Sequence, residues 1–143
     1  MPSVLVDSGP LIALFDVSDR HHATTLAFLG KSREDLLTTW PVVTEVCHLL
    51  KFSVETQLDF LRWVQRGGLE IADFERSVID PIVTLTEKYR DRPMNLADAS
   101  LIVLSMKTGI RRILSLDADF DIYRLPDRSR LTNVLPPPTK KRK

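Results

Sequence analysis

Residues 95–121 read NLADASLIVLSMKTGIRRILSLDADFD, and they carry the strongest indication of the fold class. The first half of this stretch, Leu96 to Lys107, is mostly apolar, which predicts a buried helix with Asn95 as its N-cap. The run Ile113–Leu116 then predicts a short buried strand that leads directly into Asp117. An apolar helix followed at once by a short apolar strand is typical of a parallel α/β sheet.

The rest of the chain repeats this alternation of short apolar strands and amphipathic helices. Strands are predicted over 4–6, 36–39, 69–72 and 131–135, and helices over 11–15, 22–29, 42–51, 54–65 and 79–89. Ser8 is the expected N-cap of the first helix, and Gly30 is the expected end of the second. The pattern predicts an α/β fold with a mostly parallel central sheet and helices on both faces.

Length and composition indicate one folded domain. The 143 residues are 43% hydrophobic and 27% charged, values that argue against disorder and against a coiled coil. The single cysteine, Cys47, forms no internal disulfide, and no apolar run approaches the ~20 residues of a membrane span. Since no signal peptide is evident, we expect a cytoplasmic protein without membrane contact. Residues 1–135 are the predicted domain, and 136–143 are a predicted disordered, Pro-rich, basic tail.

The charge distribution gives no sign of a nucleic-acid-binding surface. The chain has 20 Lys and Arg against 19 Asp and Glu, but the last four residues are all basic. The remaining residues carry 16 positive against 19 negative side chains, a net charge of −3. Any function on nucleic acid must therefore come from a specific site.

Four carboxylates occupy positions where an α/β sheet builds such a site. Asp7 and Asp117 each end a predicted strand, Asp98 lies in the first turn of its helix, and Glu45 lies early in another. Taken singly, each acid has an ordinary structural explanation as a cap, turn or surface residue. Together they are expected at the carboxyl ends of the parallel strands, where ligands bind in this class of sheet.

Such a cluster needs protons or a cation. Two like charges ~4 Å apart repel by about 4 kcal/mol at an effective dielectric constant of ~20. Carboxylate oxygens suit Mg²⁺ or Mn²⁺, with water completing the coordination shell. Metals held in this way serve phosphodiester chemistry, because they generate hydroxide and screen the charge of the phosphate.

Four blocks of the sequence resemble PIN-domain proteins of the VapC-type toxin ribonuclease group. They are VLVDSGPLIALFD over 4–16, VVTEVCHLL over 42–50, NLADASLIVLSMKTG over 95–109 and ILSLDADFDIYR over 113–124. The blocks occur in the order typical of that family, and the resemblance extends over about residues 4–135. Four ordered blocks are more specific than any one of them alone.

The resemblance implies a Rossmann-like α/β/α sandwich and an Mg²⁺- or Mn²⁺-dependent endoribonuclease. It also implies a homodimer that acts on RNA and is neutralised by an antitoxin. Asp7, Glu45, Asp98 and Asp117 match the acidic quartet of the family. In this assignment Asp7, Asp98 and Asp117 hold the metal, and Glu45 orients or deprotonates the attacking water.

Three features stay open at the level of sequence. Asp119 is near enough to Asp117 to replace or assist it. Asn95 occupies a position where related sequences often have an acid. Ser8 either supports Asp7 by a hydrogen bond or caps the helix. A non-catalytic PIN-like module that binds RNA or protein, and a metal-dependent DNA nuclease, are the alternative functions.

Aromatic and apolar residues suggest where partners bind. Trp40, Phe60 and Trp63 are candidates for stacking on bases, although the helical spacing of Phe60 and Trp63 favours a place in the core. The apolar positions over 54–64 form the expected groove for an antitoxin.

Overall fold

Five parallel strands form one sheet in the order β3-β2-β1-β4-β5. The computed structural model describes residues 2–135, so the predicted tail over 136–143 lies outside the described residues. The strands are β1 (Ser3–Val6), β2 (Asp35–Thr39), β3 (Glu70–Ala72), β4 (Arg112–Leu114) and β5 (Thr132–Asn133). Because the order reverses direction at β1, the carboxyl end of this strand faces the place where α/β sheets bind ligands.

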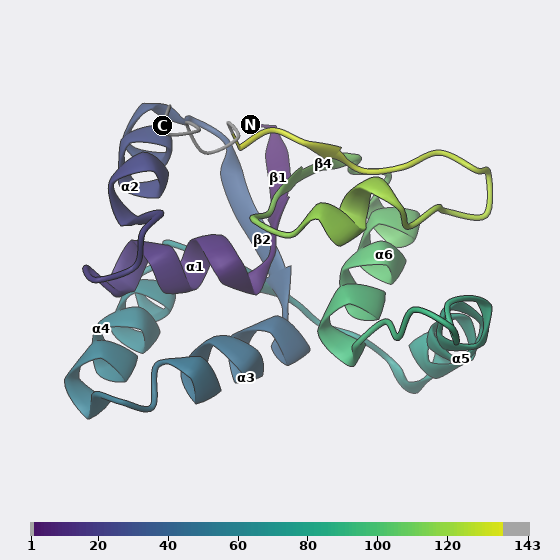
Figure 1. The fold of residues 1–143 in the computed structure, drawn as a ribbon, viewed down its shortest axis with the longest axis horizontal. Helices are drawn as coiled ribbons and strands as arrows, with labels where there is room; N and C mark the ends of the chain where they lie inside the picture. The colour runs from purple at the N-terminus through teal and green to yellow at the C-terminus, as the bar shows by residue number, and fades with distance from the viewer. Residues whose placement is uncertain (1, 136–143) are drawn as a thin grey trace, which may run out of the picture.

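Helices cover both faces of the sheet. They are α1 (Ser8–Phe15), α2 (His22–Lys31), α3 (Trp40–Leu49), α4 (Val54–Gln65), α5 (Ile79–Lys88) and α6 (Leu96–Thr108). In Figure 1, α1, α2 and α4 lie on one side of the strands, and α5 and α6 lie on the other. Helix α3 contacts both α1 and α6, so it joins the two layers. The predicted α/β fold with a parallel sheet is confirmed.

The centre of the core lies between the sheet and α6. Every residue of α6 from Ala97 to Ser105 is buried, as expected for a helix that is apolar on all sides. In the middle of the sheet, Leu5 pairs with Leu37 on one side and with Ile113 on the other. Strands buried on both faces are continuously apolar, which is why no polar alternation marks them in the sequence. Among the helices over residues 2–135, none is both long and apolar enough to span a bilayer.

Two predicted helix boundaries are wrong. The N-cap of α1 is Asp7 and not Ser8, because β1 ends at Val6 and leaves Asp7 in an extended conformation whose carboxylate accepts the Ser8 N–H at 2.8 Å. Gly30 does not end α2, which continues to Lys31. Nothing lies within 4 Å of the position of a Cβ on Gly30, so this glycine is simply an exposed helical residue.

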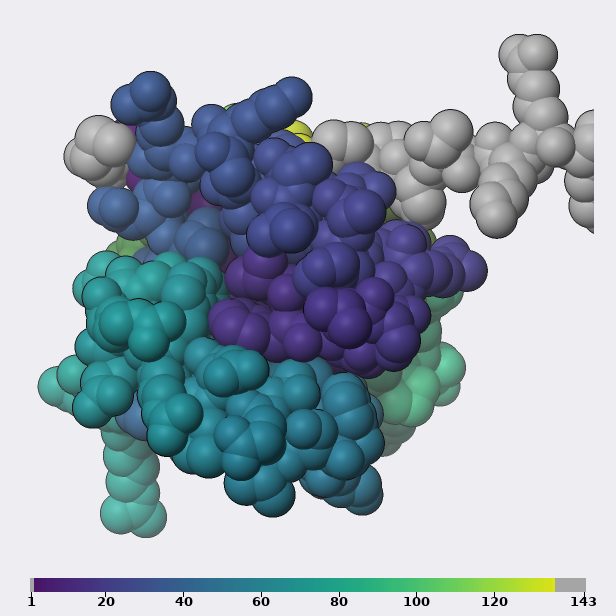
Figure 2. All heavy atoms as spheres, turned by 90° about the vertical axis from the view of Figure 1, so that its left-hand side faces the viewer, coloured from purple at the N-terminus to yellow at the C-terminus, as the bar shows by residue number. Residues whose placement is uncertain are grey.

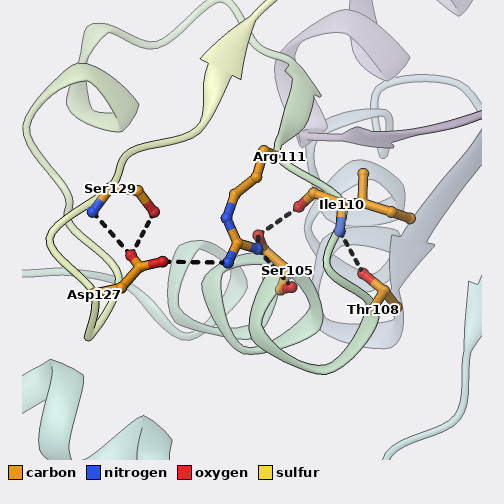
Figure 3. Close-up of polar contacts among 6 residues, drawn as sticks. All are labelled: Ser105, Thr108, Ile110, Arg111, Asp127 and Ser129. Atoms are coloured by element: carbon orange, nitrogen blue, oxygen red, sulfur yellow. Dashed lines mark hydrogen bonds and ion pairs between the residues drawn. The ribbon is translucent and has the colours of Figure 1, made fainter.

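Polar contacts hold the C-terminal segment against α6 (Figure 3). The Arg111 guanidinium donates to the backbone carbonyl of Ser105 at 3.0 Å and to its Oγ at 2.9 Å. Its other terminal nitrogen lies 3.7 Å from the Asp127 carboxylate, which in turn accepts the backbone N–H of Ser129. These contacts fix one end of the loop that carries Tyr123 back to the first turn of α6.

Candidate metal centre

Asp7 lies at the carboxyl end of β1 and is 4% exposed. Its Oδ1 accepts the Ser8 N–H, and its Oδ2 accepts the Ser115 hydroxyl at 3.0 Å. Burial raises the pKa of Asp7 to about 6, and the negative charges of Glu45 and Asp117 add to the effect. The two hydrogen bonds oppose the shift, because they stabilise the ionised carboxylate.

Asp98 lies in the first turn of α6 and is 5% exposed. The side chain of Asn95 caps the helix by accepting the Asp98 N–H at 2.8 Å, which confirms the predicted role of Asn95 as N-cap. The Tyr123 hydroxyl donates to Asp98 Oδ2 at 3.3 Å. Burial, followed by the charges of Asp7 and Asp117, raises the pKa of Asp98 to about 7. The carboxyl group of Asp98 thus loses its proton far less readily than an exposed aspartate.

Asp117 and Asp119 lie in the turn that follows β4. Asp117 Oδ1 accepts the backbone N–H of Asp119 at 2.9 Å, which orders the turn. One carboxylate oxygen each from Asp98, Asp117 and Asp119 lies within 4.8 Å of the other two. Asp119 also pairs with the Arg92 guanidinium at 2.8 Å. Asp119 therefore lies beside Asp98 in addition to Asp117 and does not replace Asp117.

Glu45 enters from a third element. It is half-buried on α3, and its negative charge contributes to the raised pKa values of both Asp7 and Asp98. The acids that the sequence places on β1, α3, α6 and the turn after β4 thus influence one another electrostatically at one edge of the sheet.

Two side chains that hold the site were missed at the level of sequence. Ser115 Oγ donates to Asp7 and accepts the backbone N–H of Asp117 at 2.9 Å, so it links two of the acids. Tyr123 approaches Asp98, and burial raises the pKa of its hydroxyl, which therefore stays protonated as a donor. The position of Ser115, directly after a buried strand, is a weak signal for this role, whereas no periodic pattern marks Tyr123.

The donor set fits a hard divalent cation. All of the clustered ligands are carboxylate oxygens, which Mg²⁺ and Mn²⁺ prefer over softer donors. Asp7 and Asp98 are costly to ionise where they lie, and a nearby cation would offset that cost. Hydrogen bonds to Asp7 and Asp98 hold both carboxylates in place before any cation binds.

Comparison with known proteins places the chain in a family. The PIN domain family model matches residues 4–125, and the chain belongs to the PIN domain family. Ribonuclease VapC26 of Mycobacterium tuberculosis (strain ATCC 25618 / H37Rv) is 29% identical over 116 residues, which cover 80% of this chain and 86% of that protein.

Solved structures agree on the fold. VapC20 of Mycobacterium tuberculosis, described as a Sarcin-Ricin loop cleaving toxin, superposes with a TM-score of 0.77 at 17% identity, over 90% of this chain and 99% of that one. VapBC2 of Rickettsia felis, solved bound to a DNA fragment from its promoter, matches with a TM-score of 0.63 at 14% identity, over 91% and 97% of the two chains. At this level of identity the likeness shows a shared fold.

Proposed function

We propose that this protein is a metal-dependent endoribonuclease and the toxin of a toxin–antitoxin pair that acts in the cytoplasm. The single observation that carries the proposal is the cluster of carboxylates at the carboxyl edge of a PIN-domain sheet. The similarity to a VapC ribonuclease over most of both chains supports RNA as the substrate.

Asp7, Asp98 and Asp117 are the proposed ligands of Mg²⁺ or Mn²⁺. The carboxylate oxygens of Asp98 and Asp117 cluster with that of Asp119, which is close enough to contribute a further oxygen. Asp7 is outside that cluster and is linked to Asp117 through the Ser115 hydroxyl. A divalent ion in such a site lowers the pKa of bound water and screens the charge of the phosphodiester. The protein prepares the site by hydrogen bonds, since Ser115 orients Asp7 and Tyr123 orients Asp98.

Glu45 is the proposed general base. Its carboxylate accepts a proton from the attacking water, whose oxygen forms the new bond to phosphorus. The bond to the leaving oxygen breaks, and that oxygen keeps the electron pair and takes up a proton from solvent. The half-buried position of Glu45 on α3 leaves it open to solvent on one side. Direct attack by water predicts no covalent intermediate between the enzyme and the RNA.

The antitoxin is the proposed protein partner, and α4 is its proposed binding surface. The Rickettsia felis structure supports such a partner, because it is the VapBC2 complex bound to promoter DNA. Apolar side chains are exposed along the end of α3 and on α4, namely Leu49, Phe52, Val54 and Leu61. Figure 2 views the side of the molecule that α1, α2 and α4 form. A homodimer is a further part of the proposal, and sedimentation equilibrium of the purified protein tests it.

Parallel cleavage assays test the proposed activity. Labelled RNA and DNA of the same sequence are incubated with the protein in Mg²⁺, in Mn²⁺ and in EDTA. We expect discrete RNA products with metal and none in EDTA. Cleavage of DNA alone would make the protein a DNA nuclease, and the absence of cleavage in every arm would favour a non-catalytic binding module.

A further inference from the structure

A groove lies beside the carboxylate cluster. It lies between α3 and the first turn of α6, which are neighbours in Figure 1. Its volume is about 550 Å³, and it is lined by Trp40, Pro41, Thr44, Glu45, His48, Asn95, Leu96 and Ala97. A space of this size is in the range of sites that bind one small organic group.

Two large apolar side chains of the lining, one from α3 and one from α6, are exposed. Trp40 and Leu96 each have 56% of their surface open to solvent, although each begins a helix whose inner face is buried. By contrast, Phe60 and Trp63 pack with Phe15 inside the fold, at ring separations of 5.5 and 5.3 Å from it. Trp40 is therefore the more exposed of the two tryptophans.

The backbone that carries Trp40 is held firmly. The Thr38 hydroxyl donates to the Val6 carbonyl at 2.7 Å, and the hydroxyls of Thr39 and Ser100 lie 2.7 Å apart in a buried hydrogen bond. On its other side, the Trp40 carbonyl accepts the Thr44 hydroxyl at 3.0 Å. A large exposed ring on a fixed backbone loses little conformational entropy when it binds a ligand.

The groove lies next to Asp98 of the carboxylate cluster, because Ala97 lines it and precedes Asp98 in the chain. Glu45 lines the groove, and its charge acts on Asp7 and Asp98. Asn95 also lines it and accepts the backbone N–H of Asp98. A group bound between Trp40 and Leu96 would therefore lie beside the carboxylate cluster.

The chemistry of the lining favours a nucleobase. An uncharged flat ring matches the apolar walls, whereas a phosphate would meet the negative charge of Glu45. The amide of Asn95, the hydroxyl of Thr44 and the ring of His48 offer polar atoms to the edge of a base. Enzymes and binding proteins commonly hold unpaired RNA bases by stacking them on aromatic side chains.

We propose that this groove binds one unpaired nucleobase of the RNA, stacked on Trp40, in the nucleotide next to the scissile phosphate. The proposal rests on the proposed ribonuclease function. Trp40 is then a positioning residue that selects single-stranded RNA and sets which phosphate reaches the carboxylates.

The test uses Trp40→Ala, Trp40→Phe and the control Ile79→Ala, which removes a similarly exposed apolar side chain outside the groove. Fluorescence anisotropy gives the Kd of each full-length variant for labelled oligoadenylate, oligouridylate and oligocytidylate of eight nucleotides. An abasic strand of the same charge is the reference ligand. EDTA prevents metal-dependent cleavage, so binding is measured independently of catalysis.

We expect Trp40→Ala to raise the Kd for RNA about tenfold or more, Trp40→Phe to raise it less, and Ile79→Ala to leave it within about twofold. Wild-type protein should bind the abasic strand as weakly as Trp40→Ala binds RNA. Equal Kd values of wild type and Trp40→Ala for RNA would overturn the proposal. This holds even if Trp40→Ala no longer bound a protein partner, because the groove would then serve that partner and not RNA. Intact, Trp40-dependent binding without any cleavage in Mg²⁺ or Mn²⁺ would support the groove and refute only the nuclease function.

Discussion

Replacing Asp7 by Asn should stabilise the metal-free protein at neutral pH while removing a proposed metal ligand. Burial raises the pKa of Asp7 from 3.8 to about 6, so the folded state holds the proton more tightly than the unfolded chain does. The stability that this proton contributes is complete below pH 3.8 and is lost as the pH rises through about 6. Asn does not ionise, so the Asp7→Asn protein does not lose this stability as the pH rises.

The magnitude follows from the shift of about two pKa units at 1.36 kcal/mol each, which is about 3 kcal/mol. Asn retains most of the local hydrogen bonds, because its carbonyl oxygen can accept the Ser8 N–H and its amide can donate to Ser115 Oγ. In EDTA at pH 8, Asp7→Asn should therefore raise the free energy of unfolding by up to about 3 kcal/mol. At pH 4 the difference should nearly vanish.

Urea unfolding of the two proteins in EDTA, from pH 4 to pH 8, measures this difference. Asp59→Asn on α4 is the matched control, because Asp59 is an exposed aspartate and its replacement should change little at any pH. A loss of stability in Asp7→Asn that is the same at pH 4 and pH 8 would refute the reasoning. It would mean that the loss of the carboxylate as the N-cap of α1 outweighs the relief of its buried charge.

Three further predictions concern metal, packing and pH. Mg²⁺ should raise the unfolding midpoint of wild type more than that of Asp7→Asn, as thermal unfolding with and without the ion would show; equal shifts would exclude Asp7 as a ligand. Gly68→Ala should cost about 1–3 kcal/mol in urea unfolding, because a Cβ on Gly68 would lie 2.2 Å from the Trp63 ring; Gly30→Ala, with nothing within 4 Å, is the control and should not destabilise. Ser115→Ala should move the acidic limb of the pH–rate profile to higher pH, since the Ser115 hydrogen bond lowers the pKa of Asp7; an unchanged limb would contradict this role.

The elements of the fold were predictable because their signals are strong. Continuous apolar runs identify strands buried on both faces, and the long apolar segment of α6 is explained only by burial on all sides. The cap of α1 was harder to predict, because Asp7 and Ser8 are both good N-cap residues. Asp7 is the cap because β1 ends at Val6, and the end of a strand can be predicted from sequence only to within about one residue.

The acids of the site were predictable from their places at strand and helix ends, but their support was not. Ser115 and Tyr123 act through tertiary contacts, over 108 and 25 positions along the chain, that no local pattern encodes. The involvement of Asp119 beside Asp117 also depends on the geometry of the turn, which the sequence left open. Local signals therefore located the site, and only the folded structure revealed how its carboxylates are held.

If the carboxylate cluster holds the metal with which this protein cleaves RNA, loss of one carboxylate should abolish cleavage without unfolding the protein. The most direct measurement compares RNA cleavage in Mg²⁺ or Mn²⁺ by wild type, by Asp98→Asn and by the control Asp59→Asn, with folding of each variant checked by circular dichroism. We expect discrete products for wild type and Asp59→Asn, and none for a folded Asp98→Asn protein. Full activity in Asp98→Asn would contradict this role of the cluster.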